Sequence, residues 1–344
     1  MRIGVVNEQA GGAEFLERVL RLRTMHAVAW TAASGAEGVE RCRKDTPDLV
    51  LMDLLMTGMD GVEATRRIMA STPCAILIVT GSVDANPALV FAAMGAGALD
   101  AVDVPVFETD ATWSATAPLL TKIATIAQLI EEPRASGRVL QPRSIARRCR
   151  SQALIAIGAS AGGPAALAAI LGGLPEDFPA AVVIVQHVDA RFVSGMAEWL
   201  ARQSRLPVRV AKDGDRLSPG NVLLAGTSDH LALMAADRVG YRLEPRHSIY
   251  RPSIDVLFQS VTRHWPGDAV GVLLTGMGRD GALGLKALRT CGHYTVAQDE
   301  ASSAVYGMPR AAVALDAAVD VLPLEDIARK LADQLSARTL SVRT

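Results

Sequence analysis

Short apolar runs alternate with longer amphipathic stretches along most of this chain, and this alternation is what most constrains its fold. Strands that alternate with helices build a parallel sheet whose two faces are both covered by helices. Before residue 130 the pattern predicts one such α/β domain. Its expected strands are residues 3–7, 27–32, 49–54, 75–80 and 98–104.

The same alternation returns after residue 150, so we expect a second domain of this kind. Residues 131–150 separate the two blocks, lose the apolar periodicity and collect Pro, Gly, Ser and Arg, which is typical of a linker. A length of 344 residues accommodates two domains, each with its own core. The expected strands of the second block are residues 153–159, 181–186, 208–210, 222–225 and 269–275.

Ser160, His187 and Asp280 each lie just after an apolar run of the second block. These three residue types are the components of a serine hydrolase. Residues 158–163 fit the Gly-x-Ser-x-Gly form of a sharp strand-to-helix turn, in which glycines adopt backbone angles that a side chain forbids. The order Ser, His, Asp differs from the order in α/β-hydrolases, so we expect a different fold that carries the same chemistry.

Each of the three residues has an expected role. A serine hydroxyl is almost wholly protonated at neutral pH, so Ser160 needs a base before it can act as a nucleophile. His187 is the candidate base, because it follows Ser160 by one helix and one strand and should emerge at the top of a neighbouring strand. Asp280 is expected to orient the imidazole and to stabilise its charged form. Backbone amides of residues 276–278, or just after Ser160, are candidates for holding the developing oxyanion.

The glycine turn at residues 158–163 has a second interpretation, because a Rossmann unit cradles a pyrophosphate with a similar turn. Asp189 would then bind a ribose hydroxyl. This dinucleotide-binding hypothesis does not account for His187 or for the second glycine turn at residues 276–278. A third hypothesis is a catalytically weak domain that acts by docking, and the complete Ser-His-Asp set argues against it.

Polar residues also follow strands of the first block, namely Asn7, Glu8, Asp53 and Thr80. In open parallel sheets, ligands bind beyond the carboxyl ends of the strands, where the strand order reverses. Carboxylates such as Glu8 and Asp53 hold Mg²⁺ while leaving it room for a phosphate, and a carboxylate can itself be phosphorylated. The alternative is that these acids only solvate the edge of a sheet.

Composition excludes several classes of protein. Residues 151–344 contain equal numbers of basic and acidic residues, so we expect neither nucleic-acid binding nor a basic helix-turn-helix output domain. The four cysteines form no C-x-x-C pair, which fits a reduced, cytoplasmic setting. No signal-peptide pattern is present, and Gly162, Gly163 and Pro164 interrupt the uncharged run of residues 151–175, so no membrane insertion is expected.

Residues 47–61 resemble the phosphoacceptor segment of two-component receiver domains. The resemblance implies that Asp53 is the phosphorylation site, that Thr80 senses the phosphoryl group, and that Glu8 and Asp53 bind Mg²⁺. The chain departs from the receiver pattern at three positions, with Asn7 in place of an acid, Thr57 in place of a proline and Val104 in place of a lysine.

A second and longer resemblance rests on six motifs, at residues 157–164, 185–187, 251–258, 274–281, 297–300 and 305–310. Through these motifs, residues 151–322 as a whole resemble the catalytic domain of the chemotaxis-type methylesterase response regulators, the CheB family. The resemblance implies a triad of Ser160, His187 and Asp280, with the backbone amide of Met277 as an oxyanion donor.

The resemblance also implies the architecture. We expect two doubly wound parallel-sheet domains: a flavodoxin-like receiver at residues 1–122 and a Rossmann-like methylesterase domain at residues 151–344. A helix end and a basic linker at residues 123–150 would join them. In the unphosphorylated chain the receiver is expected to cover the Ser160 site.

The implied activity is that of a cytoplasmic carboxylic ester hydrolase, a protein-glutamate methylesterase and protein-glutamine glutaminase. Its substrate would be a methyl-accepting, chemoreceptor-like protein, and its phosphodonor a CheA-like histidine kinase. The esterase would need no cofactor, and the receiver would use Mg²⁺ for phosphorylation. The start of the chain, the departure at Val104 and the presence of Asp189 resemble the branch called WspF, which serves a surface-sensing array.

Overall fold

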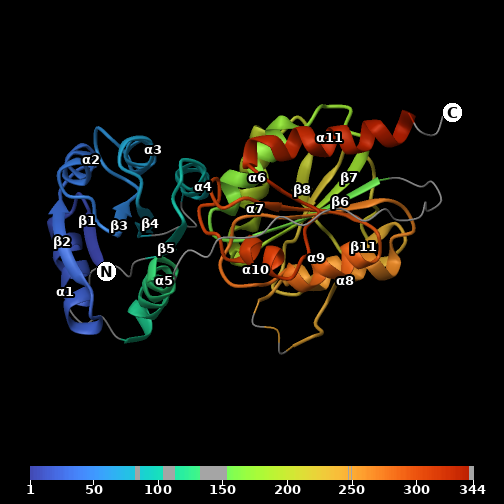
Figure 1. Ribbon diagram of the computed structural model, residues 1–344. Coiled ribbons are helices and arrows are strands. Elements are labelled where there is room, and N and C mark those ends of the chain that lie inside the picture. Colours follow the sequence, from blue (N-terminus) through green and yellow to red (C-terminus); the bar gives the residue numbers. More distant parts are fainter. Residues whose placement is uncertain (82–85, 104–112, 132–152, 247, 249, 341–344) are drawn as a thin grey trace. The chain divides into compact units, whose positions relative to one another are not determined.

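The computed structural model describes residues 1–81, 86–103, 113–131, 153–246, 248 and 250–340 (Figure 1). The chain forms two compact units, Met1–Arg134 and Ala135–Thr344, with separate sheets and separate hydrophobic cores. The domain boundary expected at residue 122 falls inside α5, a helix of the first unit. Residues 132–150 of the expected linker lie outside the described residues, as does Val104.

A five-stranded parallel sheet with strand order β2-β1-β3-β4-β5 forms the centre of the first unit. This is the flavodoxin-like order, which reverses between β1 and β3. The strands are β1 (Arg2–Val6), β2 (Ala27–Ala32), β3 (Leu49–Asp53), β4 (Ala75–Thr80) and β5 (Asp100–Asp103). The helices are α1 (Ala10–Arg23), α2 (Gly35–Lys44), α3 (Gly61–Ser71), α4 (Pro87–Gly95) and α5 (Trp113–Glu131).

Both faces of this sheet are buried, which explains why its strands are almost continuously apolar. On one face, Ile3 and Val5 pack in a cluster with side chains of α1 and α5. On the other face, Val6 touches α2 so closely that a Cβ added at Gly38 would lie 2.8 Å from Val6 Cγ2. The N-caps of α2 and α3 are residue types that favour helix starts. The Ser34 side chain accepts from the amide of Glu37, and the Asp60 side chain accepts from the amide of Glu63.

The second unit contains a seven-stranded parallel sheet with the order β14-β13-β12-β6-β7-β9-β8, and a separate antiparallel pair β10-β11. The strands are β6 (Ala153–Ala159), β7 (Ala180–Gln186), β8 (Val208–Val210), β9 (Val222–Leu224), β10 (His230–Ala235), β11 (Arg238–Arg242), β12 (Ala269–Leu273), β13 (Tyr294–Gln298) and β14 (Asp320–Leu322). The helices are α6 (Gly163–Gly173), the 3₁₀ helix η1 (Ala190–Phe192), α7 (Val193–Gln203), α8 (Ile254–His264), α9 (Ala282–Thr290), α10 (Met308–Ala314) and α11 (Leu324–Leu340).

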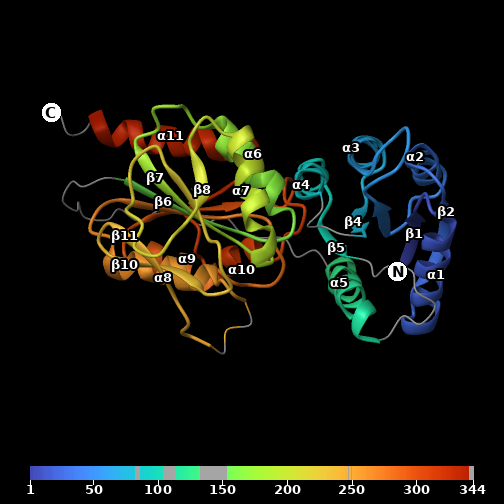
Figure 2. The same ribbon diagram turned by 180° about the vertical axis from the view of Figure 1, so that it is seen from behind.

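Two helix layers cover the seven-stranded sheet. Helices α6, α7 and α11 pack together on one face, and α8, α9 and α10 on the other (Figures 1 and 2). The chain leaves β6 toward β7 on one side and later returns to β12 on the other side, so the strand order reverses between β6 and β12. The residues that follow these two strands therefore lie at the switch point, where ligands bind in sheets of this kind.

The predicted fold class, α/β with parallel sheets, is confirmed for both units. The β10-β11 hairpin and the strands β13 and β14 are not among the strands predicted from the sequence. No helix in the part of the chain that the structure describes is long and apolar enough to cross a membrane.

Candidate active site

The three residues of the expected triad follow neighbouring strands of the second unit. Ser160 comes directly after β6, His187 directly after β7, and Asp280 lies in the loop between β12 and α9. Backbone hydrogen bonds join the three loops, since the amide of Ser160 donates to the carbonyl of Thr275 at 3.0 Å and the amide of His187 donates to the carbonyl of Ala159 at 3.0 Å. The sheet topology thus brings together residues that are far apart in the sequence.

Glycines allow these loops to approach one another. A Cβ added at Gly276 would lie only 2.7 Å from the Cβ of Ser160, so a side chain there would push the serine away. Gly162 has φ of 74° and precedes α6, a conformation that residues with a side chain rarely adopt. The two glycine turns noted in the sequence therefore serve the close packing around Ser160.

His187 and Asp280 form a direct hydrogen bond, with 2.9 Å between Nε2 and Oδ2. Both side chains are largely buried, at 12% and 5% exposed respectively. Because Nε2 faces a carboxylate, it carries the ring hydrogen and Nδ1 keeps its lone pair. His187 Nδ1 is itself buried and has no hydrogen-bond partner among the described residues, so it is the nitrogen that can accept a proton.

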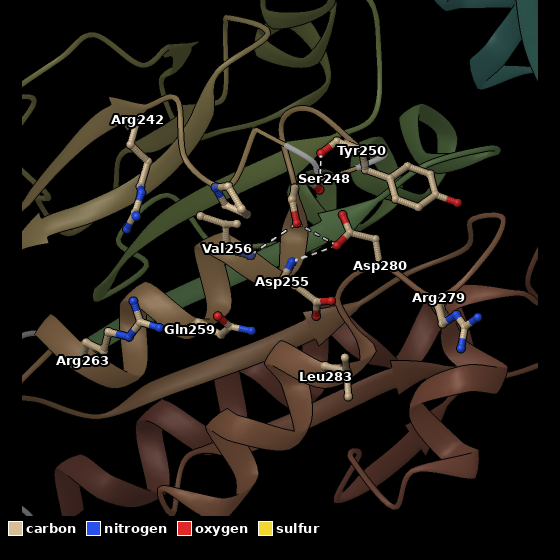
Figure 3. A pocket seen from close by; sticks show the side chains of 12 residues that line it. Arg242, Ser248, Tyr250, Asp255, Val256, Gln259, Arg263, Arg279, Asp280 and Leu283 are labelled. Atoms are coloured by element: carbon tan, nitrogen blue, oxygen red, sulfur yellow. Dashed lines mark hydrogen bonds between the residues drawn. The ribbon is translucent and has the colours of Figure 1, made fainter.

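Asp280 is held by a dense set of donors at the start of α8 (Figure 3). Oδ1 accepts from the Ser253 hydroxyl at 2.8 Å and from the amide of Asp255 at 3.2 Å. Oδ2 accepts from the amide of Ile254 at 2.7 Å in addition to His187. Burial alone raises the pKa of Asp280, but the bonds and charge of His187, with those of Ile254 and Ser253, hold that pKa below its usual value.

Tyr250 is a part of the site that the sequence analysis missed. Its ring stacks on the imidazole of His187, with 4.7 Å between ring centroids and an interplanar angle of 5°. The Tyr250 hydroxyl occupies the space where a side chain at Gly278 would stand. Burial raises the pKa of the Tyr250 phenol. The tyrosine thus supports the imidazole on one face as a neutral ring.

Gln186 and Thr275 fix the backbone around the serine. The Gln186 side-chain amide donates to the carbonyl of Ser160 at 2.8 Å and to that of His187 at 3.1 Å. The Thr275 hydroxyl donates to the carbonyl of Ala161 at 2.9 Å. Gln186 lies within the sequence motif that identified His187, but only the fold shows that it bonds to both loops.

Met277 lies at the centre of the second glycine turn. The turn is fixed on both sides of it, since the amide of Gly276 donates to Val305 at 2.9 Å and the amide of Met308 donates to the Gly276 carbonyl at 2.8 Å. The Met277 amide has no acceptor among the residues that the structure describes. A backbone N–H that is positioned and unoccupied is what an oxyanion requires.

Asp189 was the residue on which the dinucleotide-binding hypothesis depended. Its carboxylate accepts from the amide of Arg191 at 3.0 Å and forms an ion pair with the Arg191 guanidinium at 3.1 Å. Both carboxylate oxygens are thus engaged within the loop, which leaves the Ser160 arrangement as the chemistry that the site supports.

The polar residues of the first unit lie at the carboxyl ends of β1, β3 and β4, and the other switch point lies between β1 and β3. Asp53 ends β3, Thr80 ends β4 and is buried, and Asn7 and Glu8 follow β1. Asp53 accepts from the amide of Leu55 at 3.3 Å. Burial is the main cause that raises the pKa of Asp53, and the charge of Glu8 adds to it.

The Mg²⁺ expected in the receiver would have two carboxylates available, those of Glu8 and Asp53. Mg²⁺ is commonly held by one or two carboxylates together with substrate phosphate, so this pair fits that mode of binding. Glu8 has other partners in the structure, because its carboxylate accepts from the Thr57 amide at 3.0 Å and from the Thr57 hydroxyl. No cluster of three or more His, Cys, Asp or Glu side chains suited to a metal occurs within the described ranges.

Comparisons with known proteins agree with this geometry. A family model described as CheB methylesterase matches residues 155–331, and one described as response regulator receiver domain matches residues 3–111. Protein-glutamate methylesterase/protein-glutamine glutaminase 3 of Pseudomonas aeruginosa is 56% identical over 335 residues, which cover 97% of this chain and 99% of that relative.

A second relative, from Burkholderia lata, is named protein-glutamate methylesterase/protein-glutamine glutaminase 2 and is 57% identical over 340 residues, which cover 98% of each chain. The crystal structure of the Thermotoga maritima CheB methylesterase catalytic domain matches with a TM-score of 0.51 and 34% identity, and it covers 54% of this chain and 100% of that chain. These findings confirm the family predicted from the sequence motifs, and the chain therefore belongs to the CheB methylesterases that carry a response-regulator receiver domain.

Proposed function

We propose that this protein is a protein-glutamate methylesterase and protein-glutamine glutaminase that uses Ser160, His187 and Asp280 as its triad. Its substrates are glutamyl methyl esters and glutamine side chains of a methyl-accepting, chemoreceptor-like protein. The observation that carries the proposal is the bond between His187 Nε2 and Asp280, which leaves Nδ1 as the basic nitrogen of the ring. The backbone amide of this histidine donates to the carbonyl of Ala159, the residue before Ser160. The names of the two relatives support the choice of substrate.

The reaction proceeds through an acyl-enzyme. Ser160 Oγ attacks the ester carbonyl carbon while its proton passes to His187 Nδ1. The bond to the methoxy group breaks, and the same proton leaves with methanol. A water molecule then attacks the acyl-enzyme, Nδ1 takes its proton and returns it to Ser160 Oγ, and glutamate is released. Asp280 stays ionised throughout, because its pKa lies below the usual value.

The Met277 amide is the proposed donor to the oxyanion that forms when Ser160 attacks. Hydrolysis of a glutamine side chain follows the same steps, with ammonia in place of methanol as the leaving group. These steps use only side chains and backbone amides of the second unit, and no cofactor enters the proposed esterase chemistry.

Control by the receiver is the second part of the proposal. Asp53 accepts a phosphoryl group from a CheA-like histidine kinase, and Thr80 contacts that group. Glu8 and Asp53 would hold a Mg²⁺ ion, which would neutralise charge on the phosphoryl oxygens. Asn7 completes the pocket. Phosphorylation biases the chain toward an arrangement in which the Ser160 site is open.

The proposed domain limits are residues 1–122 for the receiver, 123–150 for the linker and 151–344 for the methylesterase domain. The protein would act in the cytoplasm, where its kinase and the signalling helices of its receptor are found. Membership of the WspF branch, and with it a surface-sensing pathway, stays a prediction.

The test measures methanol released from methylated receptor membranes by the full chain. We expect release by the wild type, its loss in Ser160→Ala, and its increase when acetyl phosphate is added as phosphodonor. Ser194→Ala is the matched control, because Ser194 is exposed on α7 and should leave release unchanged. Absence of release under every condition would contradict the esterase and favour a docking module in a signalling array. Release that ignores acetyl phosphate would contradict only the proposed control.

A further inference from the structure

A pocket of about 540 Å³ lies directly beside the proposed triad (Figure 3). Two of its walls belong to the site already described, since Asp280 and Tyr250 both line it. Tyr250, which lines the pocket, also stacks on the imidazole of His187. Ser160 and His187 do not line the pocket. A molecule bound there would therefore lie next to the reacting groups without occupying the place of the ester.

Three arginines line this pocket, and none of them forms an ion pair with a described residue: Arg242 at the end of β11, Arg263 on α8 and Arg279 in the loop before Asp280. Other arginines of the same unit are paired. Arg251 lies 2.9 Å from Asp229, for example, and Arg216 lies 2.6 Å from Asp237. Guanidinium groups stay charged at all ordinary pH values, so the pocket holds three positive charges that form no ion pair with a described residue.

Acidic groups in the pocket are already engaged. Asp280 accepts hydrogen bonds from four donors, including His187. Asp255 accepts from the amide of Gly284 at 2.6 Å at the start of α9. The pocket therefore contains three guanidinium groups and two carboxylates, and the carboxylate of Asp280 is paired with His187. The net charge of the pocket is positive.

The pocket also has an apolar side. Leu283 is 58% exposed, which is unusual for so large an apolar side chain, and Val256 lies on the neighbouring helix α8. Figure 3 shows Arg242 and Arg263 at one end of the pocket and Arg279 at the other, with Leu283 between them. A single small anion could contact one end only. An occupant that matches the whole pocket combines acidic groups with apolar surface.

We propose that this pocket docks an acidic, amphipathic segment of the polypeptide substrate, next to the residue whose side chain enters the Ser160 site. The carboxylates of that segment would pair with Arg263 and Arg242 at one end and with Arg279 at the other, and its apolar side chains would cover Leu283. This inference rests on the proposed function, because it assigns the part of the substrate that surrounds the ester. In this proposal the three arginines help to bind the substrate and take no part in breaking the ester bond.

The test compares two substrates of the full chain, methylated receptor membranes and a small chromogenic acetate ester. In Arg242→Ala/Arg263→Ala we expect KM for the receptor to rise about five- to twentyfold, with kcat and small-ester hydrolysis within about twofold of the wild type. The difference in KM should shrink as salt is added, because exposed charges are screened. Arg205→Ala is the matched control, since Arg205 is exposed in the same unit, lies outside the pocket and should leave KM unchanged.

An unchanged KM in the double variant would overturn the docking proposal while leaving the esterase intact. The docking proposal would also be overturned if inorganic phosphate at low millimolar concentration competed with the receptor for the wild type, because that result would identify a site for a small anion. Failure of the proposed function has a different signature, namely small-ester hydrolysis by the wild type without any release of methanol from the receptor. In that case the docking proposal is tested by measuring how tightly the Ser160→Ala protein binds receptor membranes. Adding Arg242→Ala and Arg263→Ala should weaken this binding, and unchanged binding would contradict the proposal.

Discussion

Asp280 and Asp53 occupy equivalent places in the two units, each beyond a parallel strand at the point where the strand order reverses. Asp280 is buried and Asp53 is partly buried, and burial pushes both pKa values upward. The outcome differs. The pKa of Asp280 ends below its ordinary value, whereas the pKa of Asp53 ends above it.

The difference comes from the partners of each carboxylate. Asp280 receives a hydroxyl, two backbone amides and the imidazole of His187. Among the described residues, Asp53 is stabilised by backbone amides alone, those of Leu55, Leu54 and Glu8, and it is repelled by the negative charge of the Glu8 side chain. The same position in the fold therefore gives a carboxylate whose charge is well stabilised in the second unit, at Asp280, and one whose charge is poorly compensated in the first unit, at Asp53. The first suits the proposed role of orienting a base, and the second suits the proposed role of phosphoacceptor.

Asp280→Asn should have the largest effect on this contrast. An asparagine has no charge to stabilise the imidazolium, and its amide can present a donor to Nε2 and so favour the wrong tautomer of His187. We expect kcat for methanol release to fall about a thousand- to ten-thousandfold, as in other triads. Steady-state kinetics on methylated receptor membranes measure it. Asp237→Asn, at an exposed aspartate paired with Arg216, is the control, and a loss below tenfold in Asp280→Asn would contradict the role of Asp280.

Asp53→Asn should separate the two units functionally. It removes the proposed phosphoacceptor and leaves every residue of the second unit unchanged, so basal methanol release should stay and the stimulation by acetyl phosphate should disappear. The measurement is the ratio of release with and without acetyl phosphate. Glu40→Gln on the exposed surface of α2 should keep the wild-type ratio. Stimulation that survives in Asp53→Asn would show that another residue is the phosphoacceptor.

The sequence predicted the parts of the site that depend on strand ends. Because all strands of these sheets run parallel, their carboxyl ends share one edge, and polar residues after apolar runs must meet there. Ser160, His187 and Asp280 were found in this way, and so were Asp53 and Thr80. The family resemblance then assigned roles that spacing alone left open.

Other parts of the site could not be read from local patterns. Ser253 and Asp255 reach Asp280 only because the start of α8 packs against the start of α9, and no periodicity states which helices pack together. Ser253 did carry a signal as the N-cap of α8, where it accepts from the Val256 amide. Tyr250 follows the β10-β11 hairpin, which was missed as well, so its stacking on His187 had no basis in the sequence.

Asp255 extends the comparison within the second unit. Burial raises its pKa to about 6, and the nearby charge of Asp280 contributes. The folded state therefore binds a proton more tightly than the unfolded chain does, and stability should fall as the pH rises from the ordinary aspartate value toward about 6. The contribution of Asp280 to the free energy of unfolding depends on pH in the opposite direction. Because its pKa is lowered, it adds stability at pH values above the ordinary aspartate pKa, and this stability is lost on acidification.

Asp255→Asn keeps an oxygen that can accept from the Gly284 amide but removes the buried charge. We expect the second unit to gain about 1 kcal/mol at pH 8 and clearly less at pH 5, where the wild-type carboxyl is increasingly protonated. Urea denaturation at the two pH values measures the difference. Asp333→Asn, on α11, is the control and should show no gain at either pH. An equal gain at both values would contradict the buried charge as its cause.

The smallest expected effect concerns the donors around Glu8. The donors around Asp280 stabilise the negative charge that the proposed reaction uses. At Glu8, by contrast, the Thr57 amide and hydroxyl donate to a carboxylate that a bound Mg²⁺ would need as a ligand. Removing the hydroxyl in Thr57→Ala should make Glu8 easier to redirect and tighten Mg²⁺ binding about two- to threefold, because the bond lies at an exposed site and contributes little. Calorimetric titration of the full chain with MgCl₂ measures the dissociation constant. Ser71→Ala, at the exposed end of α3, should leave it unchanged, and weaker Mg²⁺ binding in Thr57→Ala would mean that the threonine positions Glu8 for the metal instead of withholding it.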